Sequence, residues 1–230
     1  MPRKIEAVIF DMDGVLIDAK EWHYDALNRA LSLFGLNISR YDHIVTYDGL
    51  PTRMKLQMLS RERGLPDELH DFINQMKQIY TMEIIYAKCK PTFYHQFALT
   101  RLKADGYRMA VCSNSVRQSI DMMLNRSDLN QYFDFFLSAE DVENPKPAPD
   151  IYIKAINRLG LEPEQCLIVE DNPNGIKAAE ESGAHLFRVS DVTEMTHNNI
   201  MRKLQNLEKN YGKKVLKDTD LFQTLKRMEN

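Results

Sequence analysis

This chain has few cysteines, few long apolar runs and only a small excess of one charge. Its 230 residues include three cysteines, and the formal net charge is −3 at pH 7. The three cysteines (Cys89, Cys112 and Cys166) are widely spaced and do not fit a disulfide framework, so we expect buried, reduced thiols in a cytosolic protein. The small net charge argues against a nucleic-acid surface or a polybasic membrane anchor. The first apolar run is too short for a signal peptide or a membrane span.

The rest of the composition is typical of an ordinary globular protein. Hydrophobic residues make up 43% of the sequence and charged residues 27%, which is the usual balance for soluble domains. The length fits one large domain or two smaller ones. We find no internal repeat or low-complexity segment. We therefore expect a soluble, cytoplasmic, monomeric protein without nucleic-acid or membrane partners.

The most informative stretch follows the apolar run over residues 5–10, which is typical of a buried strand. Asp11 and Asp13 come directly after this run, and Gly14 lets the backbone turn away. Side chains at i and i+2 of an extended chain project to the same side. Two such carboxylates repel unless a cation lies between them, and Mg²⁺ prefers oxygen ligands. A β-turn, where Asp and Gly are common, explains the stretch equally well by itself.

A helical module follows this first strand. The apolar periodicity predicts helices over residues 20–34, 52–63 and 67–87, with a loop over residues 46–51. No strand pattern interrupts this part of the chain. We therefore expect a small α-helical domain over residues 18–87, inserted into a larger domain made of residues 1–17 and 88–230.

The larger domain alternates between helices and strands. Helical patterns cover residues 92–104, 116–125, 150–159 and 173–182, and strand patterns cover residues 107–112, 133–137, 166–169 and 185–189. Strands separated by single helices predict an α/β fold, with a doubly wound parallel sheet covered on both faces. From about residue 193 the chain is polar, with a helical pattern and basic residues that we interpret as a solvated face.

Polar residues suited to phosphate chemistry recur just after predicted strands. Ser113 and Asn114 follow the strand that ends at residue 112, Lys146 lies in the loop after residues 133–137, and Glu170 and Asp171 follow residue 169. In doubly wound folds, ligands bind beyond the carboxyl ends of the strands. We therefore expect these loops and the Asp11–Asp13 stretch to converge on one crevice.

Each of these residues also has a plainer interpretation. Ser113 could cap the following helix, and Lys146 could be one of many surface lysines. Prolines on both sides of Lys146 restrict its backbone, however, which favours an aimed side chain. Glu170 and Asp171 could simply be acids at a helix N-terminus. Four coincidences at equivalent positions favour a shared site.

Together these residues resemble the signature of the haloacid dehalogenase superfamily of phosphohydrolases. Its four motifs match Asp11-Met12-Asp13-Gly14-Val15, Ser113-Asn114, Lys146, and Glu170-Asp171 with the later Gly175-Ile176. The resemblance runs from residue 5 to about residue 189. The helical insertion is similar to the small cap of the branch that holds β-phosphoglucomutase and many sugar-phosphate and phosphoglycolate phosphatases.

The resemblance implies a catalytic role for the first two carboxylates and a magnesium site. Asp11 would be the nucleophile that accepts the phosphoryl group, and Asp13 would protonate the leaving oxygen and then activate water. Mg²⁺ would be held by the Asp11 carboxylate, the Asp13 carbonyl and Asp171, with Glu170 contacting it directly or through water. The presence of Asp13 argues against dehalogenation, because a halide leaving group needs no proton.

The resemblance also implies how the transferred phosphoryl group is held. Ser113, the backbone around Asn114, and Lys146 would neutralise its charge, since positioning and charge stabilisation carry most of phosphoryl transfer. On the inserted helices, His23, Thr52, Arg53 and Lys77 are candidate substrate contacts. Packing against the apolar stripe explains His23 equally well, and plain solvent exposure explains Arg53 and Lys77.

Three departures favour a phosphatase over a mutase. The mutases carry an arginine for a second phosphate three residues after the loop glycine, where this chain has Thr52, with Arg53 one residue later. Ala19 replaces their hinge threonine, and Ser113-Asn114-Ser115 is closer to the phosphatase pattern. We therefore expect a Mg²⁺-dependent phosphatase of a small phosphorylated metabolite, such as a sugar phosphate. The alternatives are a sugar phosphomutase and a non-catalytic binding protein on the same scaffold.

Overall fold

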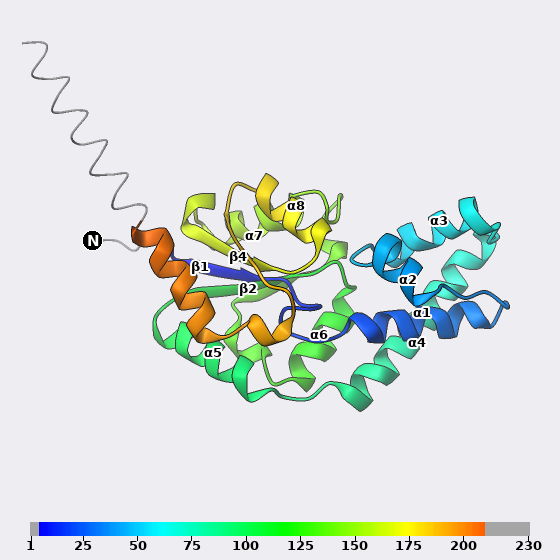
Figure 1. Cartoon of the computed structure of the whole chain (residues 1–230), viewed down its shortest axis with the longest axis horizontal. Coiled ribbons are helices and arrows are strands. Elements are labelled where there is room, and N and C mark those ends of the chain that lie inside the picture. The colour runs from blue at the N-terminus through cyan, green and yellow to red at the C-terminus, as the bar shows by residue number, and fades with distance from the viewer. Residues whose placement is uncertain (1–4, 210–230) are drawn as a thin grey trace, which may run out of the picture.

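Five parallel strands form one sheet in the order β3-β2-β1-β4-β5 in the computed structural model, which describes residues 5–209 (Figure 1). The strands are β1 (Ala7–Phe10), β2 (Arg108–Cys112), β3 (Phe135–Leu137), β4 (Cys166–Glu170) and β5 (His185–Arg188). The strand order changes direction at β1, which pairs with β2 on one side and β4 on the other. In such folds the crevice at this reversal is the usual ligand site.

Helices cover both faces of the sheet because each buried strand is apolar on both sides. Alternate residues of β1 enter different clusters, with Val8 and Phe10 on one face and Ala7 and Ile9 on the other. The first face is covered by α5 (Phe93–Ala104), α6 (Arg117–Arg126) and a helix over residues 197–209, and the second by α7 (Asp150–Leu159) and α8 (Pro173–Glu181). The predicted doubly wound α/β fold is confirmed.

The remaining helices lie together beyond one end of the sheet (Figure 1). They are α1 (Lys20–Ser32), α2 (Arg40–Asp42), α3 (Thr52–Arg63) and α4 (His70–Lys88), with a π-helical turn η1 (His43–Tyr47) and a 3₁₀ turn η2 (Asp67–Leu69). Buried residues such as Leu27, Leu59 and Ile73 give them an apolar cluster of their own. These helices therefore have an apolar core of their own, while Ile85 of α4 is also buried in the cluster on the first face of the sheet.

Several predicted boundaries differ from the structure. The short helix α2 and the turn η1 were not predicted, because their sequence leaves Ile44 and Val45 exposed (60% and 64%) and so shows no amphipathic stripe. The third strand begins at Phe135 rather than at residue 133, because the 3₁₀ turn Asn130–Tyr132 occupies the preceding stretch. Glu170 is the last residue of β4, paired with Arg188, and does not follow the strand.

The C-terminal helix over residues 197–209 packs against the sheet layer. Ile200 and Leu204 are buried in the cluster on the α5 side, so this part of the predicted polar tail also has an apolar side. The rest of that predicted tail, residues 210–230, and residues 1–4 lie outside the described range.

The three cysteines are buried free thiols, as predicted. Within residues 5–209, none of the helices combines the length and the apolar character needed to cross a lipid bilayer.

Candidate active site

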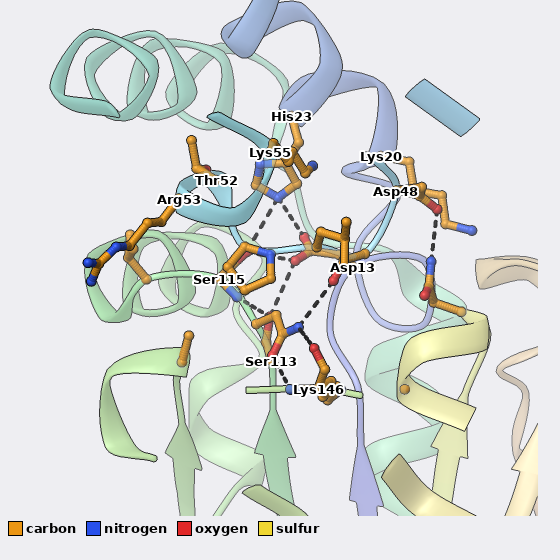
Figure 2. A pocket seen from close by; sticks show the side chains of 18 of the residues that line it. Asp13, Lys20, His23, Asp48, Thr52, Arg53, Lys55, Ser113, Ser115 and Lys146 are labelled. Carbon is orange, nitrogen blue, oxygen red and sulfur yellow. Dashed lines mark hydrogen bonds and ion pairs between the residues drawn. The ribbon is translucent and has the colours of Figure 1, made fainter. Parts of the chain in front are cut away.

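A pocket of about 210 Å³ lies between the carboxyl ends of the strands and the helices α1, α3 and α4. Asp11 and Asp13 enter it after β1, Ser113 after β2, and Lys146 from the loop after β3. Figure 2 shows Ser113 and Lys146 on the sheet side, His23 and Lys55 on the helical side, and Asp13 between them. The structure thus brings together the residues that the sequence predicted to converge.

Lys146 is the central cation of the sheet side. Its side chain is almost fully buried, and Nζ donates to Oδ1 of Asp11 (2.6 Å), Oε1 of Glu170 (2.7 Å) and the carbonyl of Cys112 (2.8 Å). The ring of Tyr152 lies 4.7 Å from the ammonium. These contacts use all three ammonium protons, and the two carboxylates raise the pKa of Lys146 despite its burial. Lys146 therefore stays charged at any ordinary pH.

Asp11 is buried next to this ammonium with one oxygen free. Its backbone N–H donates to the carbonyl of Val169 (2.9 Å), which continues the β1–β4 pairing to the start of the site. Burial raises the pKa of Asp11, and the Glu170 charge adds to this, while Lys146 opposes it. Lys146 contacts Oδ1, and no hydrogen bond from the described residues reaches Oδ2. Asp11 can therefore present a carboxylate oxygen to a ligand.

Asp13 differs from Asp11 because both of its oxygens are engaged. Nε2 of His23 lies 3.1 Å from Oδ1, and the hydroxyls of Ser115 (2.8 Å) and Ser113 (3.3 Å) donate to Oδ2. Burial alone would raise the pKa of Asp13, but His23 and Ser115 outweigh it and lower the pKa. Two carboxylates two residues apart are thus held in different environments, which is a common basis for dividing catalytic roles.

His23 links the helical side of the pocket to Asp13. Burial lowers its pKa, although Asp13 opposes this, so the ring is neutral at pH 7. Nζ of Lys77 lies 3.3 Å from Nδ1. An ammonium can only donate, so the contacts fit the tautomer in which Nδ1 accepts from Lys77 and the Nε2 proton points to Asp13. His23 is therefore held by polar contacts on both ring nitrogens.

Asp11, Glu170 and Asp171 form a cluster that can hold a metal ion, because one oxygen from each lies within 4.8 Å of the others. Neither oxygen of Asp171 accepts a well-formed hydrogen bond from the described residues, although both are buried. The ion pair that reaches Asp171 comes from Lys20, with Nζ 2.5 Å from Oδ2. Burial raises the pKa of Asp171 to about 6, against the opposing effect of Lys20. A divalent cation would satisfy these oxygens, so the residues fit such an ion.

Gly14 provides the space for this acidic cluster. Its φ of +99° is one that other residues rarely adopt, and a Cβ at this position would lie 2.2 Å from Oδ2 of Asp171. Both the turn after the first motif and the close approach of Asp171 therefore require glycine here.

Gly175 has a similar role on α8, where the limit is space rather than backbone conformation. A Cβ there would lie 1.7 Å from Oε1 of Glu170, the oxygen that accepts from Lys146 and from the hydroxyl of Tyr152 (2.9 Å). The other oxygen of Glu170 accepts from the backbone of Asp171 (2.9 Å). The glycine thus lets α8 approach a fully bonded buried carboxylate.

Gly175→Ala should lower the free energy of unfolding by about 1–3 kcal/mol, because the added methyl group displaces Glu170. Helix propensity alone predicts the opposite sign, since alanine is favoured over glycine by about 1 kcal/mol within a helix. Urea denaturation measures the change, with Lys177→Ala on the exposed face of the same helix as the control. An unchanged or increased stability for Gly175→Ala would mean that Glu170 is not held as described.

The loop between η1 and α3 is tied to the sheet side of the pocket. The side-chain amide of Asn114 donates to the carbonyl of Gly49 (3.1 Å), and that of Asn172 donates to Asp48 (2.9 Å). Asn114 also bonds the backbone N–H and carbonyl of Lys146, each at 3.0 Å. Its side chain therefore connects two loops, a role that the sequence did not indicate.

The predicted substrate contacts on the helices are placed differently from one another. His23 and Lys77 lie inside the pocket, as described above. Thr52 and Arg53 line it, but Arg53 is exposed and extends away from Asp13 (Figure 2). The plainer interpretation of Arg53 as a solvated residue fits this position better than a substrate contact.

Sequence reasoning missed three residues of the site: Ser115, Lys20 and Lys55. Ser115 lies two residues after Ser113 and so faces the same carboxylate. Lys55 precedes Leu59 by four residues and therefore lies on the buried side of α3. That spacing was the available signal for Lys55. Lys20 gave no such signal, because its partner Asp171 is distant in sequence.

Comparison with known proteins finds similar sequences that match most of this chain. The family model for haloacid dehalogenase-like hydrolases matches residues 8–189. The "Phosphorylated carbohydrates phosphatase" of Thermotoga maritima is 31% identical over 182 residues, covering 78% of this chain and 82% of that protein. The phosphoglycolate phosphatase of Aquifex aeolicus is 28% identical over 179 residues, covering 78% of this chain and 82% of the other.

Solved structures also share this fold. The crystal structure of β-phosphoglucomutase from Clostridium difficile superimposes with a TM-score of 0.76 at 22% sequence identity, covering 88% of this chain and 98% of that one. At this identity the likeness concerns the fold alone.

Proposed function

We propose that this chain, which belongs to the haloacid dehalogenase-like hydrolase family, is a Mg²⁺-dependent phosphatase of a small phosphorylated metabolite. The observation that carries the proposal is the contrast between two carboxylates in one pocket. Asp11, beside the Lys146 ammonium, has one oxygen that accepts no hydrogen bond from residues 5–209, whereas both oxygens of Asp13 are bonded. This division suits one nucleophile and one acid–base group.

In the proposed reaction, the free oxygen of Asp11 attacks phosphorus and the substrate oxygen leaves. Asp13 donates the proton that the leaving oxygen needs, and the resulting aspartyl-phosphate is then hydrolysed by water, which gives its proton to Asp13. The lowered pKa of Asp13 favours its ionised form. The second half of the reaction needs this form, because Asp13 must then accept a proton. A phosphoryl group entering the pocket adds negative charge and favours the protonated form needed in the first half.

The remaining core residues would position and neutralise the phosphoryl group. We propose that Lys146 and the hydroxyl of Ser113 contact its oxygens, together with the backbone around Asn114. The position of both side chains on the sheet side of the pocket supports this role. Lys146 contacts Asp11, and Ser113 contacts Asp13. His23 would hold Asp13 in position through its Nε2 contact. Preorganised charges of this kind supply much of the catalysis in phosphoryl transfer.

Mg²⁺ would be held by the carboxylates of Asp11 and Asp171 and the backbone carbonyl of Asp13, with Glu170 contacting it directly or through water. When bound, it would neutralise charge on the phosphoryl group and orient that group for attack. The buried oxygens of Asp171, which lack hydrogen bonds from the described residues, support this assignment.

We also propose that residues 18–87 form a cap domain on a core made of residues 1–17 and 88–230. The separate apolar cluster of α1, α3 and α4 supports this division. The hydrogen bonds of Asn114 and Asn172 to the loop at residues 48–49 would form when the cap closes and part when it opens. A closed cap would control the access of water to the aspartyl-phosphate.

The substrate class follows from the pocket and the relatives. A pocket of about 210 Å³ suits a small metabolite rather than a polymer. The similar proteins named above act, by name, on phosphorylated carbohydrates and on phosphoglycolate. We therefore propose a sugar phosphate or a similar organic phosphate. We further propose a location in the cytoplasm, supported by the buried free cysteines.

Purified protein should release inorganic phosphate from members of a panel of phosphorylated sugars and organic acids when Mg²⁺ is present. EDTA should abolish the release, and excess Mg²⁺ should restore it, because the phosphoryl charge would otherwise be poorly neutralised. Colorimetric phosphate determination makes the measurement. Absence of release from the whole panel would contradict the proposal and favour a non-catalytic binding protein.

A sugar phosphomutase is the second candidate, because the mutases also carry a histidine on the first cap helix, where His23 of this chain contacts Asp13. Thr52, at the position where the mutases carry a phosphate-binding arginine, weighs against it. Incubation with a hexose 1-phosphate and its bisphosphate separates the two: a mutase forms the 6-phosphate without net release of phosphate, whereas a phosphatase releases phosphate.

A further inference from the structure

Lys55 is a buried cation whose ammonium forms no hydrogen bond or ion pair within residues 5–209. It is 6% exposed and lies on α3 with the buried residues Leu56 and Leu59. Burial lowers the pKa of Lys55 to about 8, so the group still carries its charge at neutral pH but at an energetic cost. Buried charges are normally paired, so an anionic ligand would supply the pairing that this ammonium lacks among the described residues.

Lys77 adds a second ammonium on the same side of the pocket. Its protein contact is the neutral ring of His23, at 3.3 Å, rather than a carboxylate. Burial and the charge of Lys55 together lower the pKa of Lys77 to about 8, against the opposing effect of Asp13, so the two lysines are close enough to repel each other. Both line the pocket that also contains Asp13 and Lys146.

The charges of Asp48 and Asp13 act on these lysines and oppose the lowering of the Lys55 pKa, but both carboxylates form their hydrogen bonds with other residues. Asp48 accepts a hydrogen bond from Asn172 (2.9 Å), and Asp13 is bonded by Ser115 and His23. On the sheet side, the charge of Lys146 is matched by two carboxylates. On the helical side, by contrast, no carboxylate of the described residues forms a hydrogen bond or ion pair with Lys55 or Lys77, so both ammonium groups can donate to a ligand.

We propose that Lys55 and Lys77 bind a second anionic group, a carboxylate or a phosphate, on the part of the substrate that leaves with the cleaved oxygen. The inference rests on the proposed function, because it assigns the sheet side to the transferred phosphoryl group. It narrows the substrate class to metabolites with two anionic groups. Hydrogen bonds between charged partners of this kind contribute on the order of tenfold to a hundredfold in affinity.

Matched ligand pairs that differ in the second anion provide the test. One pair is phosphoglycolate and ethylene glycol monophosphate, and the other is a hexose bisphosphate and the corresponding hexose 1-phosphate. Calorimetry measures binding to the Asp11→Asn variant with Mg²⁺, so that no turnover is needed. We expect the doubly anionic member of at least one pair to bind about tenfold tighter or better. The pair that shows this preference identifies the second group as carboxylate or phosphate.

Adding Lys55→Met to this variant should reduce the preference to within about threefold, because the apolar side chain cannot donate to an anion. Lys77→Met should act in the same direction, while Lys90→Met, which changes an exposed lysine, should leave the preference intact. Equal affinities within both pairs, or a preference that Lys55→Met does not change, would overturn the inference. Failure of the proposed function is detected separately, as absence of phosphate release by the wild-type protein.

The free protein provides a second readout. Burial of an ammonium that makes no hydrogen bond to the described residues is costly, so Lys55→Met should raise the melting temperature by about 2–4 °C. A fall in melting temperature would mean that Lys55 has a structural partner, which would also overturn the inference.

Discussion

Asp11→Asn should fold normally and lose activity by roughly 10⁴- to 10⁶-fold in kcat, the scale seen when a covalent nucleophile is removed. An amide oxygen cannot form the aspartyl-phosphate, so no later step compensates for the change. Stability should stay within about 1 kcal/mol of wild type, because the variant loses an ion pair but also loses the cost of a buried charge. Lys146 keeps its contacts with Glu170 (2.7 Å) and the Cys112 carbonyl (2.8 Å).

Phosphate release and thermal melting measure these two outcomes. Asp121→Asn, which makes the same chemical change at an exposed position on α6, should leave both unchanged. Activity of Asp11→Asn above about a tenth of wild type would contradict the nucleophile assignment, since no mechanism through this carboxylate tolerates its loss.

Lys146→Met should combine a large loss of stability with a large loss of activity. The methionine leaves Asp11 and Glu170 buried without the cation that contacts both of them. Removing one member of a buried ionic network costs about 3–5 kcal/mol in the free energy of unfolding. Activity should fall by roughly 10²- to 10³-fold, because the variant also lacks a preorganised donor to the phosphoryl group.

Added Mg²⁺ distinguishes this explanation from simple misfolding. A divalent cation shared by Asp11 and Glu170 would replace part of the missing positive charge, so Mg²⁺ should stabilise Lys146→Met more than it stabilises the wild type. Urea denaturation with and without Mg²⁺ makes the comparison, with Lys90→Met as the exposed control. A variant as stable as wild type without Mg²⁺ would show that the two carboxylates do not depend on Lys146.

The parts that were predictable from the sequence are those that depend on local pattern. Apolar strand runs alternating with amphipathic helices indicate a parallel sheet, and parallel strands place their carboxyl ends along one edge. That rule was enough to group Asp11, Asp13, Ser113 and Lys146 before their distances were known. The short helix α2 and the π-helical turn η1 were not predicted, because a short exposed segment carries no periodic pattern.

The sequence by itself determined the order of strands and helices and the chemistry available at the strand ends, since both follow from residue type and spacing. The tertiary structure decided which side chains complete the site. Lys20 reaches Asp171, Asn114 joins two loops, and the Lys55 side chain lines the pocket without a hydrogen-bond partner in the described part of the chain. These contacts depend on how each helix is rotated and how distant segments approach. The rotation of each helix and the approach of distant segments result from packing between many parts of the chain. No single stretch of sequence specifies them.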